Sequence, residues 1–246
     1  MKRPQAVAVD TAGNVYVTDR DLHAVFKYGP RGTGKPLYVL SGLANPTGVA
    51  VDIDGNLYVT DGGGMSNGSV LKIARDGTRT PIADAAGWHN PTGVAVDAHG
   101  TLYVTDDGGS THGGRVMRFT AGTAQPVGAG WKTPRAVAVD LAGNVYVTDD
   151  GDVYYGEHPS SVVRVNPDGT MTLVASDWRY PEGVAVDSDG TVFVADHPTS
   201  TVFRVSPTGQ KAAVQKMAGE PTGLALGPGV LYVIDSRITA IDRKDQ

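Results

Sequence analysis

A proline-anchored unit recurs six times along this 246-residue chain. Each unit starts with a proline, continues through an apolar stretch and a polar turn, and ends in a second stretch of the type Leu-Tyr-Val-Thr-Asp. A period of about 40 residues with β-rich segments in every unit is typical of the blades of a β-propeller. The anchors are Pro4, Pro46, Pro91, Pro134, Pro181 and Pro221.

Each unit encodes several short strands. In the segment from Pro46 to Asp61, PTGVAVDIDGNLYVTD, two valine- and tyrosine-rich runs flank an Asp-x-x-Gly turn that reverses the chain. A third run such as Val70 to Ile73 and a fourth such as Met171 to Ala175 complete the unit. We therefore predict an all-β fold, a six-bladed β-propeller with four-stranded antiparallel blades, as a single domain over residues 1–246 with almost no helix.

The sixth unit is shorter than the others. It supplies runs at Leu224 to Leu226, Leu231 to Asp235 and Ile238 to Ile241, and then a charged tail. The last blade is therefore predicted to have three strands. Two explanations stay open: the domain is excised from a longer chain, or the blade is naturally three-stranded and the charged tail protects its edge.

The recurring Pro-x-Gly-Val-Ala-Val-Asp, Gly-Asn-x-Tyr-Val-Thr-Asp and Val-x-Lys/Arg-Val segments resemble the NHL repeat family over essentially the whole chain. The chain is most similar in style to bacterial NHL proteins such as the extracytoplasmic sensor domains of PknD-type serine/threonine kinases. The resemblance implies a propeller, and it leaves the function open. NHL-like propellers include binding platforms and a peptidylglycine amidating lyase, and related six-bladed folds include metal-dependent lactonases.

Charge and composition exclude some partners. The net charge is -5 and the basic residues are scattered, which argues against nucleic acid binding, because phosphate neutralisation needs a concentrated basic face. No apolar run is long enough to insert into a membrane, and there is no cysteine. We expect a monomer that binds a small molecule, a peptide or a protein. Its location stays unknown: extracytoplasmic if it belongs to a sensor kinase, otherwise cytoplasmic.

Strand direction sorts the connections onto two faces of the ring. Loops from the second to the third strand and links between blades open on one side, called here the upper face, and the Asp-x-x-Gly turns lie on the lower face. Five of the six histidines fall on the upper face: His23, His89, His112, His158 and His197. We interpret His23 and His89 as ordinary packing and surface residues, and the other three as candidates for chemistry.

Long loops on a rigid scaffold are where binding residues concentrate. Two upper loops, in blades three and four, are rich in carboxylates, phenols and imidazoles, and the residue after each anchor proline is expected at the upper mouth of the channel. Arg135 and Glu182 are the two charged residues at that position, and they either pair with each other or orient a polar ligand. The predicted ligand-binding residues are Asp107, Arg135, Asp150, Asp152, Tyr154, Tyr155, Glu182 and His197.

Two kinds of chemistry fit these loops. Convergence of His112, His158 and His197 would form a site for a divalent metal, Zn²⁺ or Ca²⁺, with a position left for water. Alternatively, His158 and Glu157, with His112, would act as catalytic acid and base in a metal-free lyase. The same residues also suit plain solvated loops.

Residues repeated in every unit are interpreted as architectural. The strand-ending aspartates recur in all six units, and Trp88, Trp131 and Trp178 each lie three residues before an anchor proline, where they would fill an apolar slot between blades. The aspartates are Asp19, Asp61, Asp106, Asp149, Asp196 and Asp235.

The favoured function is a ligand- or protein-binding propeller, for example a sensor module, that uses the upper face of blades three to five. The alternative is a lyase or hydrolase that acts on a small molecule at the same place.

Overall fold

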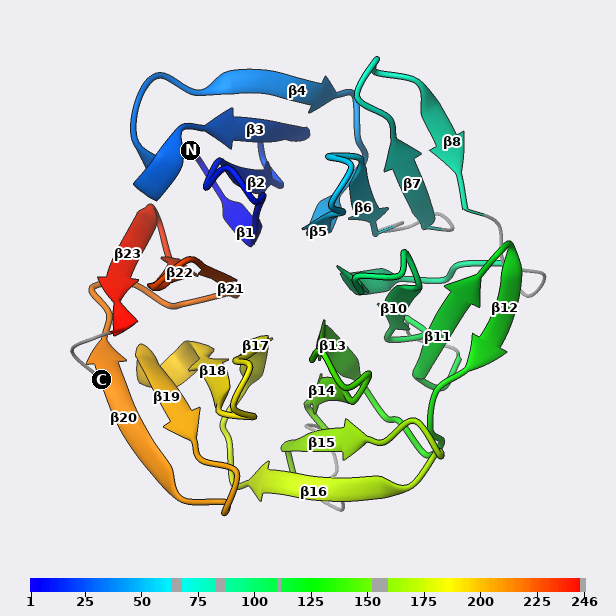
Figure 1. Cartoon of the computed structure of the whole chain (residues 1–246), viewed down its shortest axis with the longest axis vertical. Helices are drawn as coiled ribbons and strands as arrows, with labels where there is room; N and C mark the ends of the chain where they lie inside the picture. The colour runs from blue at the N-terminus through cyan, green and yellow to red at the C-terminus, as the bar shows by residue number, and fades with distance from the viewer. Residues whose placement is uncertain (63–67, 83–86, 110–111, 152–158, 244–246) are drawn as a thin grey trace.

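The computed structural model describes residues 1–62, 68–82, 87–109, 112–151 and 159–243, and these residues form six antiparallel sheets arranged as a ring (Figure 1). Five sheets have four strands and the last has three, which confirms the predicted six-bladed propeller. Helix in the described residues is limited to two short 3-10 turns, η1 (Pro30–Gly32) and η2 (His197–Thr199). None of the described helical segments has the length and apolar character to span a membrane.

The first strand of each blade lies innermost. Each first strand contacts those of the two neighbouring blades, and β1 contacts β21, so the ring closes. Five of these strands begin at the anchor proline, which suits a strand start because proline has no N–H to donate. The first strands are β1 (Pro4–Val9), β5 (Pro46–Val51), β9 (Pro91–Val96), β13 (Pro134–Val139), β17 (Pro181–Val186) and β21 (Gly223–Gly227).

The second strand of every blade is buried along its whole length. Alternate side chains point to opposite faces of the sheet, so one strand contributes to two cores. Val17 packs toward blade six, for example, whereas Tyr16 packs toward blade two. The second strands are β2 (Val15–Asp19), β6 (Leu57–Asp61), β10 (Leu102–Asp106), β14 (Val145–Asp149), β18 (Val192–Asp196) and β22 (Val230–Ile234).

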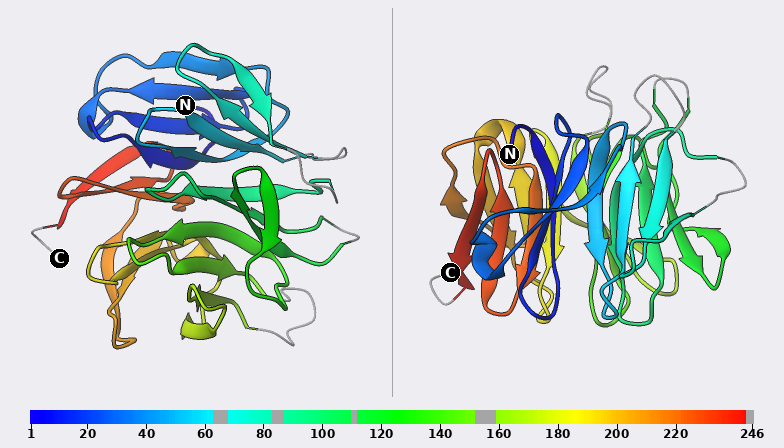
Figure 2. Two further views of the ribbon diagram at one scale, coloured as in Figure 1. Left: turned by 45° about the vertical axis from the view of Figure 1, so that its right-hand side comes forward. Right: turned by 90° about the horizontal axis from the view of Figure 1, so that it is seen from above.

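The outer strands complete the blades close to the predicted bounds. The third strands are β3 (Ala24–Tyr28), β7 (Ser69–Ile73), β11 (Arg115–Thr120), β15 (Ser161–Val165), β19 (Thr201–Val205) and β23 (Ile238–Asp242). The fourth strands are β4 (Leu37–Ser41), β8 (Arg79–Pro81), β12 (Thr123–Pro126), β16 (Met171–Ser176) and β20 (Lys211–Lys216). Seen from the side, the strands run between the two faces of the ring and the connections lie on one face or the other (Figure 2).

The strand-ending aspartates are architectural, as their repetition predicts. Asp149 is buried and accepts hydrogen bonds from the backbone N–H groups of Lys132 (2.9 Å) and Thr133 (2.8 Å), the two residues before the anchor proline of the same blade. Asp19, Asp61, Asp106 and Asp196 accept the equivalent pair of bonds, and Asp235 accepts one, from the Gly219 N–H. Each aspartate therefore fixes the start of the innermost strand to the end of its neighbour.

The tryptophans fill the slots between blades. Trp88, Trp131 and Trp178 are buried, and each belongs to a different core between neighbouring blades. Leu43 and Met217 are the buried residues of the corresponding links that enter blades two and six. The indole N–H of Trp131 donates to the Val127 carbonyl at 2.8 Å. This burial and hydrogen bonding fit the structural role predicted from spacing.

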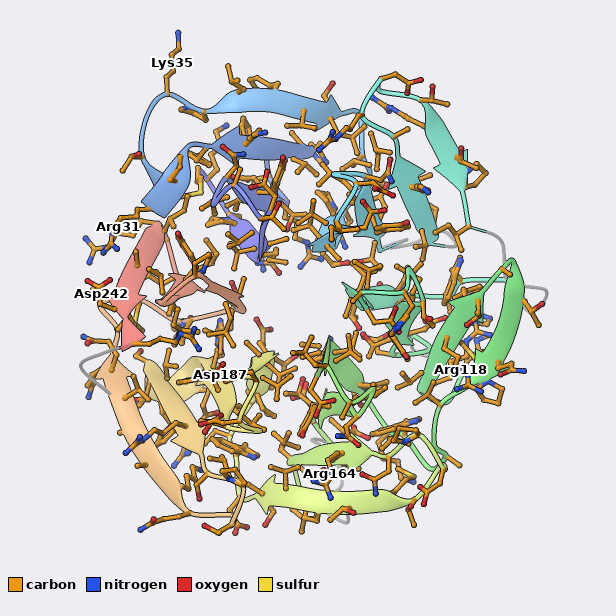
Figure 3. The ribbon with its side chains drawn as sticks, viewed as in Figure 1. Arg31, Lys35, Arg118, Arg164, Asp187 and Asp242 are labelled. Atoms are coloured by element: carbon orange, nitrogen blue, oxygen red, sulfur yellow. The ribbon has the colours of Figure 1, made fainter. Side chains whose placement is uncertain are left out.

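Blade six lacks an outer strand, and a turn of blade one lies against its open side. The Arg31 guanidinium of η1 donates to both carboxylate oxygens of Asp242 at the end of β23, at 2.9 and 3.2 Å, and the two residues lie side by side at the rim (Figure 3). Gly32 has a φ of +72°, and a Cβ there would lie 2.7 Å from the Ile238 side chain. The close contact of η1 with β23 therefore protects part of the edge that the missing strand exposes.

Candidate functional site

A cavity of about 830 Å³ opens at the upper face in the centre of the ring. It is called the upper cavity here. The residue after each anchor proline lines it in all six blades, at Gln5, Thr47, Thr92, Arg135, Glu182 and Thr222, as the repeat alignment predicts. Each first strand also contributes an apolar residue to the lining, and the side chains of these six residues are themselves buried in the cores between blades: Val7, Val49, Val94, Val137, Val184 and Leu224. A concave site toward which polar and charged groups converge is a candidate small-molecule site.

Three of the six residues after the anchor prolines join neighbouring blades. The Thr47 hydroxyl donates to the Pro91 carbonyl at 2.9 Å, and the Thr92 hydroxyl donates to the Pro134 carbonyl at 2.9 Å. Thr222 makes the corresponding, longer bond to Pro4 at 3.5 Å. Gln5, Arg135 and Glu182 replace threonine in the other blades, so at those positions the cavity gains larger polar or charged groups instead of a cross-blade hydrogen bond.

Arg135 is held by three partners. Its Nε donates to Asp150 Oδ2 at 2.7 Å, one terminal nitrogen donates to Asp107 Oδ2 at 3.1 Å, and the other donates to the Tyr180 hydroxyl oxygen at 2.5 Å. The guanidinium also lies 5.1 Å from the centre of the Tyr180 ring, within cation–π range. The expected alternative of an Arg135–Glu182 ion pair is wrong, because the guanidinium is directed to Asp107 and Asp150.

The two aspartates beneath Arg135 have different surroundings. Asp107 accepts two hydrogen bonds at 2.9 Å from the Asn90 side chain. Asp150 is almost fully buried, and its Oδ1 has no hydrogen-bond partner among the described residues. Burial raises the pKa of Asp150 to about 6 although Arg135 opposes the shift. In the structure both aspartates hold Arg135, and their predicted contact with a ligand stays a prediction.

Blades five and six provide the acidic side of the upper cavity. Glu182 lines the cavity, and burial raises its pKa against the opposing effect of His197 and the nearby arginines. His197 Nε2 lies 3.4 Å from a carboxylate oxygen of Glu220. Burial raises the pKa of Tyr180 to about 12, so its phenol stays protonated at neutral pH. Tyr180, Glu182, His197 and Glu220 therefore place a neutral hydroxyl, two carboxyl groups and an imidazole around one side of the opening.

Blade one provides the basic side. Lys2, Arg3 and Arg20 all line the upper cavity. The Arg20 backbone N–H donates to the Arg3 carbonyl at 2.9 Å, so the two arginine side chains leave neighbouring points of the chain. Partial burial and repulsion from Arg3 lower the pKa of Arg20. The upper cavity is therefore charged unevenly, basic at blade one and acidic at blades five and six.

The predicted histidine chemistry falls partly outside the described residues. Asp152, Tyr154, Tyr155, Glu157 and His158 belong to residues 152–158, which the structure does not describe. His112 is exposed and its ring stacks on that of His89 at 3.7 Å between centroids, whereas His197 contacts Tyr180 and Glu220. The catalytic role of His158, Glu157 and His112 stays a prediction.

The metal prediction finds no support in the donor set that can be described. Within the five described segments, no group of three or more His, Asp or Glu side chains is placed to hold a metal ion. His112 and His197 have separate neighbours, and the third proposed ligand, His158, lies in residues 152–158. We therefore derive no chemistry through a metal.

Sequence reasoning missed several residues of the upper cavity. Three of them, Arg3, Tyr180 and Glu220, directly precede an anchor proline. A fourth, Arg20, directly follows a strand-ending aspartate. The residue type at both positions differs from blade to blade. This variation within the repeat is the sequence signal that marks them as candidates for function. Alignment of the six units at these positions, in addition to the residue after the proline, would have found them.

Comparison with known proteins supports the fold and leaves the function open. An NHL repeat model matches residues 1–28 and 179–205. No curated protein gives a significant match. A gluconolactonase from Xanthomonas campestris aligns with a TM-score of 0.80 and 16% identity, over 96% of this chain and 84% of that chain. The PQQ-bound aldose sugar dehydrogenase of Streptomyces coelicolor aligns with a TM-score of 0.78 and 15% identity, over 96% and 89%.

A chain from a nidogen/laminin complex is also similar, with a TM-score of 0.75 and 21% identity over 91% of this chain and 87% of that chain. Enzymes and a protein complex therefore share the architecture, and at these identities the likeness shows the fold alone. The fold is a six-bladed β-propeller, and the repeat match over residues 1–28 and 179–205 supports an NHL-type propeller.

Proposed function

We propose that this propeller binds a small polar ligand in the upper cavity. The observation that carries the proposal is the placement of Arg135 and Glu182, because both stand where three other blades use a threonine to tie neighbouring strands. Three buried or half-buried groups, Asp107, Asp150 and Tyr180, hold the Arg135 guanidinium at the opening. Holding a charge in a partly buried position costs free energy, and binding a polar ligand is a function that explains the cost.

The shape of the site favours a small molecule over a flat protein surface. The cavity of about 830 Å³ lies within the range of sites that enclose drug-sized ligands, and its many polar and charged lining residues suit a polar ligand. This working surface extends beyond blades three to five, because residues of blades one, two and six also line the cavity.

The test is affinity selection from a library of water-soluble compounds that includes anions, cations, zwitterions and neutral molecules. The control variant is Glu182→Thr, which gives blade five the residue that blades two, three and six already have. We expect wild-type protein to retain at least one compound, and Glu182→Thr to weaken its binding at least about tenfold with an unchanged melting temperature. Retention of nothing, or equal retention by both proteins, would contradict the proposal.

A second candidate, a metal-free lyase or hydrolase, is favoured by the contact between His197 and Glu220 on the rim of the same cavity. An imidazole beside a carboxylate can accept and return a proton, which is the general acid–base step that such enzymes need. Long incubation of each retained compound with the protein, followed by mass spectrometry, separates the two candidates. A binding protein returns the compound unchanged, whereas an enzyme yields a product that a His197→Gln variant does not form.

A further inference from the structure

The basic side of the upper cavity lacks a neutralising carboxylate. No Asp or Glu in the described residues forms an ion pair with Arg3 or Arg20, although both side chains line the cavity. The carboxylate of Asp19, next to Arg20 in sequence, is already occupied by the backbone N–H groups of Lys2 (2.6 Å) and Arg3 (3.1 Å). Two neighbouring guanidinium groups at the opening of a cavity therefore remain available for an anion.

On the acidic side of the upper cavity, the carboxyl group of Glu182 lacks a partner among the described residues. Among the described residues, Glu182 has no hydrogen bond or ion pair, although it is half-buried in the cavity wall. The neighbouring cations are engaged elsewhere: Arg135 by Asp107 and Asp150, and His197 by Glu220. Arg3 and Arg20 act on Glu182 through space but lie beyond the 4.0 Å ion-pair distance. A carboxyl group and a guanidinium pair thus face the same cavity without touching each other.

We propose that the upper cavity binds a zwitterion of the amino-acid or short-peptide class, with its carboxylate on Arg3 and Arg20 and its ammonium group on Glu182. This inference rests on the proposed function and specifies the ligand. A zwitterion satisfies both unpaired sides at once, whereas an anion alone leaves Glu182 unpaired and a cation alone leaves the two arginines unpaired.

The first experiment compares three pools of tripeptides that share the same sequences: free, N-acetylated and C-amidated. Each pool is equilibrated with the protein, and retained members are identified by mass spectrometry. We expect retention from the free pool, and at least about tenfold weaker binding when either terminus is capped, because each cap removes one charge. Retention of nothing from the free pool, or equal retention from the capped pools, would overturn the inference.

Variants taken from other blades of the same chain assign each end of the peptide. Arg20→Ser carries the residue found at this position in blade six, and Glu182→Thr carries that of blades two, three and six. Arg20→Ser should weaken a retained free tripeptide about tenfold and leave its C-amide unaffected, and Glu182→Thr should show the same relation to the N-acetyl form. The matched control is Arg179→Ser, which removes an exposed arginine that does not line the cavity.

The outcomes separate this inference from the function on which it rests. If the compound library yields a Glu182-dependent neutral or singly charged ligand while the free tripeptides are not retained, the binding function stands and the zwitterion assignment falls. If neither library yields a Glu182-dependent ligand, both fall. If Arg20→Ser and Arg179→Ser weaken peptide binding equally, the carboxylate does not lie on the blade-one arginines, and the inference is wrong.

Discussion

On the lower face of the ring four blades make the same contact between a turn aspartate and a tyrosine, whereas at the upper mouth only blades two, three and six share the residue after the anchor proline, a threonine. In each of the four, the tyrosine hydroxyl donates to the aspartate of the Asp-x-x-Gly turn at 3.1 to 3.4 Å. At the upper mouth, the position after the anchor proline alone holds Gln, Thr, Arg and Glu. The pairs of the lower face are Asp10–Tyr16, Asp52–Tyr58, Asp97–Tyr103 and Asp140–Tyr146.

The difference distinguishes structural contacts that every blade requires from residues that serve a function at one place in the ring. A turn must be held in each blade, so the same residues recur, but a ligand binds at one place and breaks the sixfold pattern. Blade five shows the same rule on the lower face. Phe193 replaces the tyrosine there, and the turn residue Asp187 pairs with Arg243 of blade six instead. This exception lies at the junction between blade five and the three-stranded blade six, a junction that also occurs only once in the ring.

The largest effect is expected from removing a repeated aspartate. Asp149→Ala takes the acceptor from the backbone N–H groups of Lys132, Thr133 and Gly151. Because these donors are partly or fully buried, we expect the free energy of unfolding in urea to fall by about 4 kcal/mol. Asp76→Ala, in an exposed turn, is the control and should change the unfolding midpoint little. If Asp149→Ala lowered the free energy of unfolding by less than about 1 kcal/mol, the repeated aspartates would not have the architectural role assigned to them.

An unrepeated aspartate of the upper mouth should give stability a distinctive pH dependence. Burial raises the pKa of Asp150 to about 6 from its ordinary value of 3.8, so the folded protein binds this proton more tightly than the unfolded chain does. The resulting stabilisation is fully present below pH 3.8 and is lost as the pH rises through about 6. Relative to Asp150→Asn, the unfolding free energy of the wild type should therefore fall by up to about 3 kcal/mol from pH 4 to pH 7.

Urea unfolding of both proteins at several pH values measures this difference, because contributions from the other carboxyl groups largely cancel. A difference that instead grows as the pH rises would show that the attraction of Arg135 outweighs burial at Asp150.

A smaller loss is expected from the repeated contact of the lower face. Tyr58→Phe removes the hydrogen bond to Asp52 at 3.1 Å and should lower the unfolding free energy by about 1 kcal/mol. The matched control is Tyr232→Phe in blade six, because the Tyr232 hydroxyl has no hydrogen bond among the described residues. Equal losses in the two variants would show that the hydroxyl contact itself adds nothing to stability.

The smallest effect is expected at the rim between blades one and six. Arg31 and Asp242 form an exposed ion pair, and solvent and salt screen such pairs. Arg31→Ala should leave the melting temperature unchanged within error in physiological salt. A clear drop would mean that η1 holds β23 mainly through this pair, in which case ring closure depends on an unrepeated charge.

Much of the fold was predictable because it repeats. The third-strand prediction of Val70 to Ile73 compares with an observed β7 of Ser69–Ile73, and the three strands of blade six were identified from their apolar runs. The packing of η1 against β23 was not predicted, because it joins residues about 210 positions apart and belongs to no repeat.

The candidate site was predicted less well than the fold. Arg135 and Glu182 were placed correctly at the channel mouth, but the partners of Arg135 were not, and Tyr180 was overlooked. Such pairings depend on side-chain rotamers and on distances across blades, which spacing along the chain does not specify.

The sequence by itself determined the number of blades, the order of strands, the short sixth blade and the structural role of the repeated aspartates and tryptophans, because local β propensity and a regular period act on every unit alike. The tertiary structure decided which unrepeated charges meet. Only closure of the ring brings Arg3 and Arg20 of blade one into the same cavity as Glu182 of blade five, and only there do burial and electrostatic distance decide which charges are paired and which remain for a ligand.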